Sequence, residues 1–350
     1  MNSFGNIYRL TSFGESHGPA MGGVVDGAPA GEIIDIEAVE RYLARRRPGS
    51  GANVTQRNEA DKCEFLSGLM ECDAAGNPVG SIRRESKQAV TLGTSIGFIV
   101  RNSDQHSSDY TSLRDTFRPS HADYAWQQKY GVRDWRGGGR SSGRETVSRC
   151  VAGALAAQIL ERKGIKVEAT LHAMGGCADR TRFGEIISEA REAADSVGGQ
   201  VRCRVTGVPV GLGDPVFGKL DQMLAAAMMS IGGAKAFGIG DGATLATMHG
   251  SEANDQMAAN EGNVNFLSNH SGGIQGGISN GNEIVMDVFF KPTPSIDRQM
   301  HTVNAAGCDV MLQTHGRHDP CIAVRAVPVV EAMAAMTVLD ALLMQRAVRL

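Results

Sequence analysis

Residues 136–163 read RGGGRSSGRETVSRCVAGALAAQILERK, a glycine-rich loop that runs directly into the most regular helical pattern of the chain. Ser142 and Glu145 stand three residues apart, which is the spacing of a capping box at a helix start. Gly164 follows the pattern, as glycine commonly does after the last turn of a helix. The spacing predicts a helix over residues 142–163. The apolar residues that share one face of this helix are Val147, Val151, Leu155 and Ile159.

Similar periodicity predicts four more helices. In the first of them, Ile36, Val39 and Leu43 share a face, and a Pro-Gly pair after Arg47 ends the pattern. The four helices are predicted over residues 35–47, 185–197, 219–230 and 329–348.

Between the helical patterns lie short runs rich in β-branched residues, which predict strands. Long glycine-rich loops, rather than regular helical crossovers, connect most of these runs. This organisation favours mixed or antiparallel sheets over a doubly wound parallel sheet, so we expect the α+β class. Residues 71–90 read as a polar surface excursion for which we can derive no role. The predicted strands cover residues 22–25, 96–100, 165–171, 201–210, 284–290 and 322–327.

The bulk properties narrow the possible classes of function. The chain has 350 residues, of which 42% are hydrophobic, and we find neither a repeat nor a low-complexity linker. We therefore expect a single domain over residues 1–350. A net charge of −3 argues against general binding to nucleic acid or to an anionic membrane. The first residues show no secretory signal and no apolar run has membrane-spanning length, so a cytoplasmic protein is expected.

Two patterns that could indicate a bound group lack the context they need. His315 and His318 stand three residues apart, and the seven cysteines are scattered without a Cys-x-x-Cys pair, so we expect packed thiols and no metal site. Residues 238–243 match the loose dinucleotide pattern Gly-x-Gly-x-x-Ala. They lack a convincing strand before them and a clear helix after them, which argues against a Rossmann site.

The loop at residues 136–144 has the chemistry of an anion site. Its glycines let the backbone approach a ligand closely, and its serines and arginines supply donors at the positive end of the following helix. The loop is therefore predicted to bind a phosphate group. The alternative is a flexible loop whose arginines are solvated.

Other turns carry polar or titratable groups. His17 lies between two glycines, where its ring can exchange a proton near neutral pH. Residues 291–295, KPTPS, offer a lysine and two hydroxyls on a backbone set by two prolines. Residues 316–321, GRHDPC, place an arginine near a carboxylate. Each could be an ordinary surface turn when taken singly. Further arginine-bearing turns are residues 45–47, Arg57 and residues 117–123.

Taken together, five of these motifs resemble those of chorismate synthases, in the family's order and at near family spacing. The resemblance implies a β-α-β sandwich, with helices between antiparallel or mixed sheets, and a homotetramer. It also implies the monofunctional bacterial type, since no stretch is left over for a flavin reductase domain. The matching motifs are residues 14–18, 117–123, 137–145, 291–295 and 317–321.

The family's reaction is an anti 1,4-elimination, the last step of the shikimate pathway. A carbon–oxygen lyase removes phosphate from C3 and a proton from C6 of 5-enolpyruvylshikimate 3-phosphate, and chorismate forms without net redox change. Reduced FMN is nevertheless required, because the flavin lends electron density as the C–O bond breaks and then recovers it. The resemblance also associates NADP with the family. The sequence does not show which reductant keeps the FMN reduced.

The resemblance also implies roles for individual residues. His17 resembles the acid beside the leaving phosphate, and His121 the histidine that protonates the flavin near N1. Asp319 resembles the residue that works with flavin N5 to accept the C6 proton. Substrate anions would be neutralised by Arg46, Arg57, Arg118, Arg144 and Arg317. FMN would be held by Arg140, Ser141, Ser142, Gly232, Gly233, Gly276, Lys291, Pro292, Thr293, Pro294, Ser295 and Arg317.

One position departs from the family, because Ala52 stands where members often carry a further arginine.

Two rival functions also remain. A flavin oxidoreductase acting on a phosphorylated substrate would need a nicotinamide site or a hydride acceptor, and no such site is evident. A non-catalytic module that binds phosphorylated metabolites or RNA would leave His17, His121 and Asp319 without a role.

Overall fold

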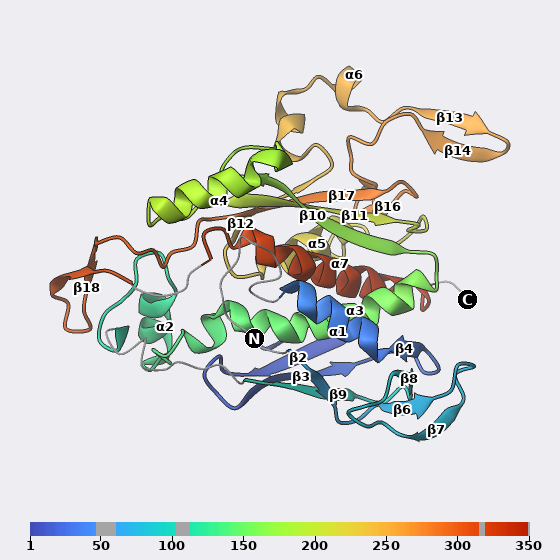
Figure 1. Ribbon diagram of the computed structural model, residues 1–350. Coiled ribbons are helices and arrows are strands. Elements are labelled where there is room, and N and C mark those ends of the chain that lie inside the picture. The colour runs from blue at the N-terminus through green and yellow to red at the C-terminus, as the bar shows by residue number, and fades with distance from the viewer. Residues whose placement is uncertain (47–60, 103–112, 315–318, 349–350) are drawn as a thin grey trace.

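The computed structural model describes residues 1–46, 61–102, 113–314 and 319–348. They form a sandwich in which a layer of helices lies between two layers of strands (Figure 1). Every strand pairing within these described ranges is antiparallel. The α+β class and the sandwich architecture predicted above are confirmed.

The lower layer in Figure 1 consists of two sheets from the N-terminal third of the chain. Met21, Val25 and Val100 are fully buried, because alternate side chains of a strand point to the helices on one face. The five-stranded sheet has the order β1 (Ser3–Phe4), β2 (Arg9–Gly14), β3 (Ala20–Asp26), β9 (Ile96–Arg101) and β5 (Cys63–Phe65). The four-stranded sheet has the order β4 (Ile33–Asp35), β8 (Gln88–Thr91), β6 (Leu69–Cys72) and β7 (Pro78–Ser81).

The interpretation of residues 71–90 as a surface excursion was incomplete. This stretch contains the end of β6 and all of β7, and it ends in β8, where Ala89 and Val90 are buried. The strands are only four residues long, and the turn at Asp73 between two of them is polar. Such short strands leave almost no alternating pattern for the sequence to show.

The upper layer is a four-stranded sheet formed by strands between residues 166 and 290, and three hairpins accompany it in the described part of the chain. The sheet has the order β10 (Lys166–Met174), β11 (Gly199–Thr206), β17 (Ile284–Phe290) and β12 (Ala234–Ile239). The hairpins pair β13 (Met257–Asn260) with β14 (Asn263–Phe266), β15 (Ile274–Gln275) with β16 (Ile278–Ser279), and β18 (Met300–Val303) with β19 (Asp309–Leu312).

Among the described residues, four helices fill the middle layer, whereas α4 (Phe183–Glu192) covers the outer face of the upper sheet (Figure 1). Gly153 allows two of the central helices to touch at their backbones, because a Cβ there would lie 2.4 Å from Cα of Ala332. The central helices are α1 (Ile36–Arg46), α3 (Thr146–Glu161), α5 (Leu220–Met229) and α7 (Ala323–Gln345). Shorter helical segments are α2 (Asp123–Tyr130), α6 (Gly250–Ala253) and the 3₁₀ turns η2 (Gly139–Ser141), η3 (Gly143–Glu145), η4 (Arg180–Arg182) and η5 (Gly242–Thr247).

Helix α7 corrects two expectations. The predicted strand at residues 322–327 is wrong, because these residues form the start of α7, which continues through Pro328. Ala323, Ala326 and Val330 are buried at helical spacing, so packing between the two sheets overrides the strand preference of the run. By length and composition α7 is also apolar enough to cross a membrane, contrary to our expectation, but most of it is buried inside the protein.

Candidate active site

A cavity of about 800 Å³ lies where the four central helices begin or end. Its walls include the C-terminal end of α1, the N-terminal ends of α3 and α7, and the turn after α5. The segment before α2 and the segment after β17 also line it. This volume is within the range of small-molecule and cofactor sites.

Most of the residues predicted from the sequence line this one cavity, although they come from segments far apart in the chain. They are Arg46, Arg118, His121, Arg140, Ser141, Ser142, Gly232, Gly233, Lys291, Thr293, Pro294, Ser295 and Asp319.

Four other predicted residues are described but lie outside the wall. His17 lies directly behind it, since a Cβ on the wall residue Gly137 would be 2.6 Å from Nε2 of His17. Pro292 sits between two wall residues, and Arg144 is buried beside the cavity. Gly276 lies in the turn between β15 and β16. The predicted residues Arg57 and Arg317 lie outside the described residues. So do three positions noted in the sequence analysis, Ala52, His315 and His318.

The glycine-rich loop forms two 3₁₀ turns in front of α3. Gly137, Gly138 and Gly139 have φ angles of +67°, +85° and +54°, which only glycine adopts readily. The Ser142 side chain accepts a hydrogen bond from Arg144 N at 3.4 Å and so caps η3, whereas α3 itself begins at Thr146. The predicted helix is therefore present, but its serine cap acts on the turn that precedes it.

Arg140 extends from this loop towards β2. Its Nη2 donates to Oγ of Ser12 at 2.7 Å, while its Nη1 is buried without a hydrogen-bond partner among the described residues. The loop thus presents an unused cationic donor in the cavity wall, as an anion site requires.

A second buried cluster joins Arg46, Asp61 and Arg144. The two guanidinium groups each donate to a different oxygen of the Asp61 carboxylate. Burial alone would raise the pKa of Asp61, but the two arginines outweigh it and lower that pKa. Nε and Nη1 of Arg46 are buried and have no hydrogen-bond partner within the described part of the chain. One carboxylate therefore orients Arg46, whose remaining donors are available to an anion.

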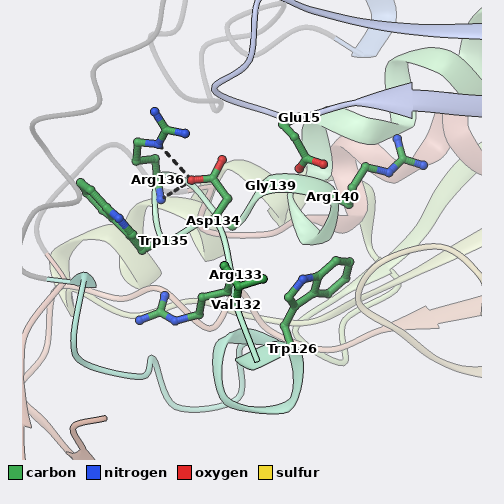
Figure 2. Close-up of a pocket in the computed structure, with 10 residues that line it drawn as sticks. Glu15, Trp126, Val132, Arg133, Asp134, Trp135, Arg136, Gly139 and Arg140 are labelled. Carbon is green, nitrogen blue, oxygen red and sulfur yellow. Dashed lines mark hydrogen bonds and ion pairs between the residues drawn. The ribbon is translucent and has the colours of Figure 1, made fainter. Parts of the chain in front are cut away.

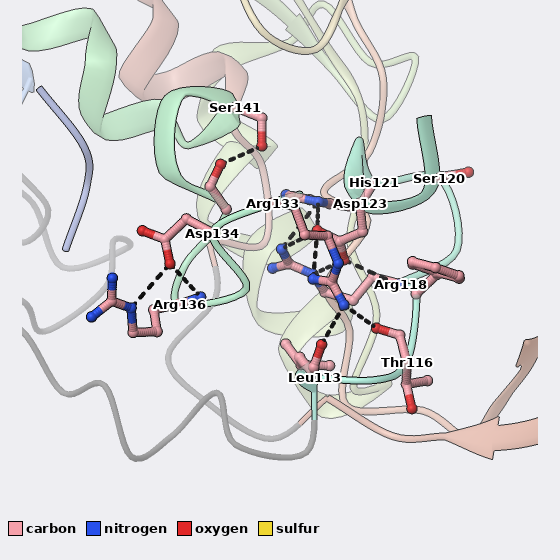
Figure 3. Close-up of polar contacts among 12 residues, drawn as sticks. Leu113, Thr116, Arg118, Ser120, His121, Asp123, Arg133, Asp134, Arg136 and Ser141 are labelled. Atoms are coloured by element: carbon pink, nitrogen blue, oxygen red, sulfur yellow. Dashed lines mark hydrogen bonds and ion pairs between the residues drawn. The ribbon is translucent and has the colours of Figure 1, made fainter. Parts of the chain in front are cut away.

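A third cluster contains Arg118, His121 and Asp123 (Figure 3). Arg118 holds Asp123 through both carboxylate oxygens, with Nε to Oδ2 at 2.8 Å and Nη2 to Oδ1 at 2.9 Å. Nδ1 of His121 lies 2.8 Å from Oδ1 of Asp123. Asp123 ends the FRPSHAD motif, and sequence analysis gave it no role. Its position two residues after His121 was the signal that could have revealed it.

Asp319 enters the cavity from the segment before α7. Its Oδ2 accepts from Nη1 of Arg325 at 2.7 Å, and its backbone carbonyl accepts from Oγ1 of Thr293 at 2.6 Å. Oδ1 is buried and has no partner among the residues described. Arg325 also lines the cavity, and sequence analysis missed it. A single arginine within the apolar run at residues 322–330 was the available signal.

A smaller cavity, of about 560 Å³, lies against the same glycine-rich loop (Figure 2). Trp126 and Arg140 line both cavities, so the loop separates the two spaces. Glu15 and Asp134 bring carboxylates to the smaller one. Burial raises the pKa of Glu15, with Arg140 opposing the rise and Asp134 adding to it.

The structure also bears on the dinucleotide pattern and the metal site considered from the sequence. Residues 238–243 do follow a strand, β12, contrary to our reasoning, but that strand is antiparallel to its neighbour and leads into a 3₁₀ turn. The parallel strand–helix unit of a Rossmann site is not formed there. Within the described residues, no group of three His, Cys, Asp or Glu side chains is arranged to hold a metal ion. Five of the seven cysteines are buried.

Comparisons with known proteins identify the family. The family model for chorismate synthase matches residues 8–343. A chorismate synthase from Parabacteroides distasonis is 47% identical over 370 residues, which cover 99% of each chain. One from Porphyromonas gingivalis is 48% identical and covers 100% of this chain and 97% of the relative. A crystal structure of chorismate synthase, 27% identical, matches with a TM-score of 0.71 over 96% of this chain and 91% of that chain. The chain therefore belongs to the chorismate synthase family.

Proposed function

We propose that this chain converts 5-enolpyruvylshikimate 3-phosphate into chorismate and phosphate by an anti 1,4-elimination, with reduced FMN bound in the larger cavity. Membership of the family makes the chain a lyase and implies a flavin cofactor. The observation that carries the proposal is the convergence of distant segments, from Arg46 to Arg325, on one cavity lined by cationic side chains.

The cavity suits a flavin and a polyanionic substrate. Arg46 and Arg140 keep buried donors without partners in the described residues. A buried and unpaired charged donor destabilises the protein, so an anionic ligand is the partner that removes this cost. Gly143 and Gly232 leave space, since no atom of the described residues lies within 4 Å of a Cβ added to either. A planar ring can therefore lie close to the backbone at these two points.

The residues that would hold FMN are residues 140–142, Gly232, Gly233 and residues 291–295, with Gly276 and Arg317 as further members carried over from the family. Bound there, reduced FMN supplies electron density to the substrate while the C–O bond at C3 breaks. The protein's own part is to position the ligands, exclude water and place charge.

The arginines divide into two groups. Arg46 has free donors and is the residue we assign to direct contact with substrate anions. The guanidinium groups of Arg118 and Arg144 are held by Asp123 and Asp61. We therefore infer that these two arginines act by fixing their neighbours and by adding positive potential around the substrate. Arg57 and Arg317 keep the substrate-binding role proposed from the resemblance.

Three side chains are positioned to hold or move protons. Oδ1 of Asp319 is the unpartnered buried oxygen that we assign as acceptor for the C6 proton. His17 lies behind Gly137, next to the loop that would receive the leaving phosphate. His121 lines the same cavity and exchanges a proton with the flavin side of the site.

We also propose that the active protein is a cytoplasmic homotetramer. The assembly is carried over from the family, and exposed apolar side chains around the β13–β14 hairpin support it. Met257, Val264 and Leu267 are 65%, 65% and 66% exposed. Light scattering of the purified protein measures the mass, and a monomer at micromolar concentration would contradict the assembly.

One experiment tests the reaction. The protein is incubated anaerobically with 5-enolpyruvylshikimate 3-phosphate and reduced FMN, while chorismate absorbance and phosphate release are followed. Equal amounts of the two products, without net oxidation of the flavin, are expected. Continued NADPH consumption matched to product would favour the oxidoreductase, and binding without turnover would favour the non-catalytic module.

A further inference from the structure

We propose that Asp123 is a positioning residue that fixes the tautomer of His121, so that Nε2 is the ring atom that exchanges a proton in the cavity. The inference rests on the proposed function, because it assumes that His121 takes part in the reaction. It assigns a role to a carboxylate that does not line the cavity itself.

The polar contacts of the His121 ring lie on one side, at Nδ1. Nδ1 of His121 lies 2.8 Å from Oδ1 of Asp123 and 3.0 Å from Nη2 of Arg118. The three residues are labelled in Figure 3. Within the described residues, both hydrogen-bond contacts of the ring are made by Nδ1. The ring itself lines the cavity. Its Cε1 lies close to the glycine-rich loop, since a Cβ added to Gly138 would be 3.0 Å away.

The contact with Asp123 selects one tautomer. Nη2 of Arg118 can only donate, but it already donates to Oδ1 of Asp123 at 2.9 Å and therefore does not need Nδ1 as an acceptor. Asp123 is ionised, because burial alone would raise its pKa but hydrogen bonds from Arg118 and His121 outweigh that effect and hold the pKa well below its usual range. An ionised carboxylate has no proton to donate, so a contact at 2.8 Å requires Nδ1 to carry the hydrogen. In the other tautomer, a lone pair of Nδ1 would face the carboxylate oxygen. The neutral ring therefore presents Nε2 as an acceptor.

The carboxylate is itself held rigidly. Arg118 donates to it from Nε, from Nη2 and from the backbone N–H, the last at 3.2 Å to Oδ2. Nη1 of Arg133 lies 3.8 Å from Oδ1 on the other side. Asp123 thus links the ring to a fixed cationic frame, in the manner of a carboxylate that orients a catalytic histidine.

Three charged groups near the ring, together with its burial, determine when it is protonated. Burial lowers the pKa of His121, and Arg118 and Lys291 lower it further, while Asp123 opposes them. The ring is therefore neutral near pH 7 in the empty cavity, with Nε2 ready to accept a proton. Arrival of an anionic ligand would favour the protonated form, because negative charge nearby stabilises the imidazolium.

The test reads the ring directly, without flavin or substrate. In protein labelled with ¹⁵N-histidine, two-bond ¹H–¹⁵N spectra distinguish a hydrogen on Nδ1 from one on Nε2. We expect the neutral His121 ring to carry its hydrogen on Nδ1. In Asp123→Asn we expect a mixture of tautomers and a lower pKa of His121, because the stabilising carboxylate charge is gone. Turnover should fall by about 100-fold or more, with a smaller change in KM.

A matched control is Asp287→Asn. Asp287 is also paired with an arginine through two hydrogen bonds, from Arg202 at 2.9 and 2.8 Å, but it lies on β17 and not at the cavity. This variant should leave the His121 spectrum unchanged. A wild-type ring with its hydrogen on Nε2, or an Asp123→Asn ring with the wild-type tautomer and pKa, would overturn the proposal.

The spectrum of the wild type decides the tautomer even if Asp123→Asn does not fold. Because it is recorded without ligands, a failure there leaves the elimination reaction untouched. Conversely, a wild type that makes no chorismate would refute the proposed function without changing the tautomer result.

Discussion

Arg325 holds Oδ2 of Asp319 at 2.7 Å and leaves Oδ1 of the same carboxylate buried and without a partner in the described chain. Nε of Arg325 donates to the backbone carbonyl of Arg46 at 3.3 Å, so the arginine ties the start of α7 to the end of α1. The acid is thereby fixed in orientation, with one oxygen bound and the other available for a proton.

Asp319→Asn should remove the proton acceptor and keep the shape of the side chain. We expect turnover to fall by about two to four decades, the usual range for lost acid–base help, with FMN still bound. Stopped-flow measurement of chorismate formation gives the rate. Asp195→Asn is the control, because Asp195 pairs with Arg298 at 2.8 Å on the surface and should keep the wild-type rate. A wild-type rate in Asp319→Asn would refute the assigned role.

Arg46→Lys should weaken substrate binding although it keeps the charge. A lysine ammonium cannot reproduce the planar fork that serves Asp61 on one side and leaves two donors for an anion on the other. We expect affinity for the substrate to fall by about 10- to 100-fold, the effect of losing a hydrogen bond to a charged group. Isothermal titration calorimetry measures it.

The adjacent Arg45→Lys is the control for that variant. Arg45 is bidentate to Glu331 and is not in the cavity wall, so its change should leave affinity for the substrate unaltered. Equal losses in the two variants would mean that Arg46 does not contact the substrate.

Gly137→Ala should impair the reaction, as we also expect of His17→Ala. The added Cβ would lie 2.6 Å from Nε2 of His17, so the ring must move. Gly131→Ala separates this clash from backbone strain, because Gly131 has a similar φ of +72° but no atom in the described ranges lies within 4 Å of a Cβ added there. We expect a large loss of turnover only in Gly137→Ala. The turnover of each variant is measured per mole of folded protein, so that a difference in stability does not affect the comparison. Equal losses in both would attribute the effect to backbone strain instead.

Gly153→Ala should destabilise the fold despite the better helix propensity of alanine. The propensity gain is about 1 kcal/mol, whereas overpacking against the backbone of Ala332 costs about 1–3 kcal/mol or more. We expect a lower free energy of unfolding in urea. Gly80→Ala on β7, where the added Cβ meets no atom of the described part of the chain within 4 Å, is the control and should show little change. An unchanged or raised stability in Gly153→Ala would show that the helices can separate freely.

Asp61 should make the free energy of unfolding decrease as the pH is lowered into the acid range. A carboxyl whose pKa is lowered on folding stabilises the fold fully above its unfolded pKa, about 3.9, and loses this effect as the pH falls through the lower folded value. Asp61→Asn should therefore lower the free energy of unfolding near pH 7 by about 3–5 kcal/mol, as expected for breaking a buried ion pair. The difference from the wild type should shrink in acid. Urea titrations over a pH series measure it, and a difference independent of pH would contradict the role.

The sequence predicted those parts of the site whose chemistry lies in short motifs. The glycines, serines and arginine before α3 form a recognisable unit because neighbouring residues provide all of its parts. The buried partners could not be found this way. Asp61 lies 83 residues from Arg144, and nothing near it in the chain shows what it contacts. The role of Asp61 depends on packing between residues far apart in the chain, and local sequence patterns do not reveal such contacts.

The fold was predictable where periodicity was strong. Helix α1 and strand β17 lie within one residue of the predicted ranges. The start of α7 was missed because β-branched residues and Pro328 favour a strand and a break, whereas burial between the two sheets stabilises a helix. Local preference is a weak guide where tertiary packing supplies most of the free energy.

The position of α7 also constrains how the protein folds. This helix lies in the middle layer, where Asp340 accepts hydrogen bonds from the backbone N–H groups of Asn6, Ile7 and Tyr8. The apolar inner faces of the two sheets stay exposed until α7 has docked against a segment more than 330 residues away in the chain. We therefore expect folding to be slow, because it depends on contacts between distant residues, and we expect deletion of α7 to abolish it.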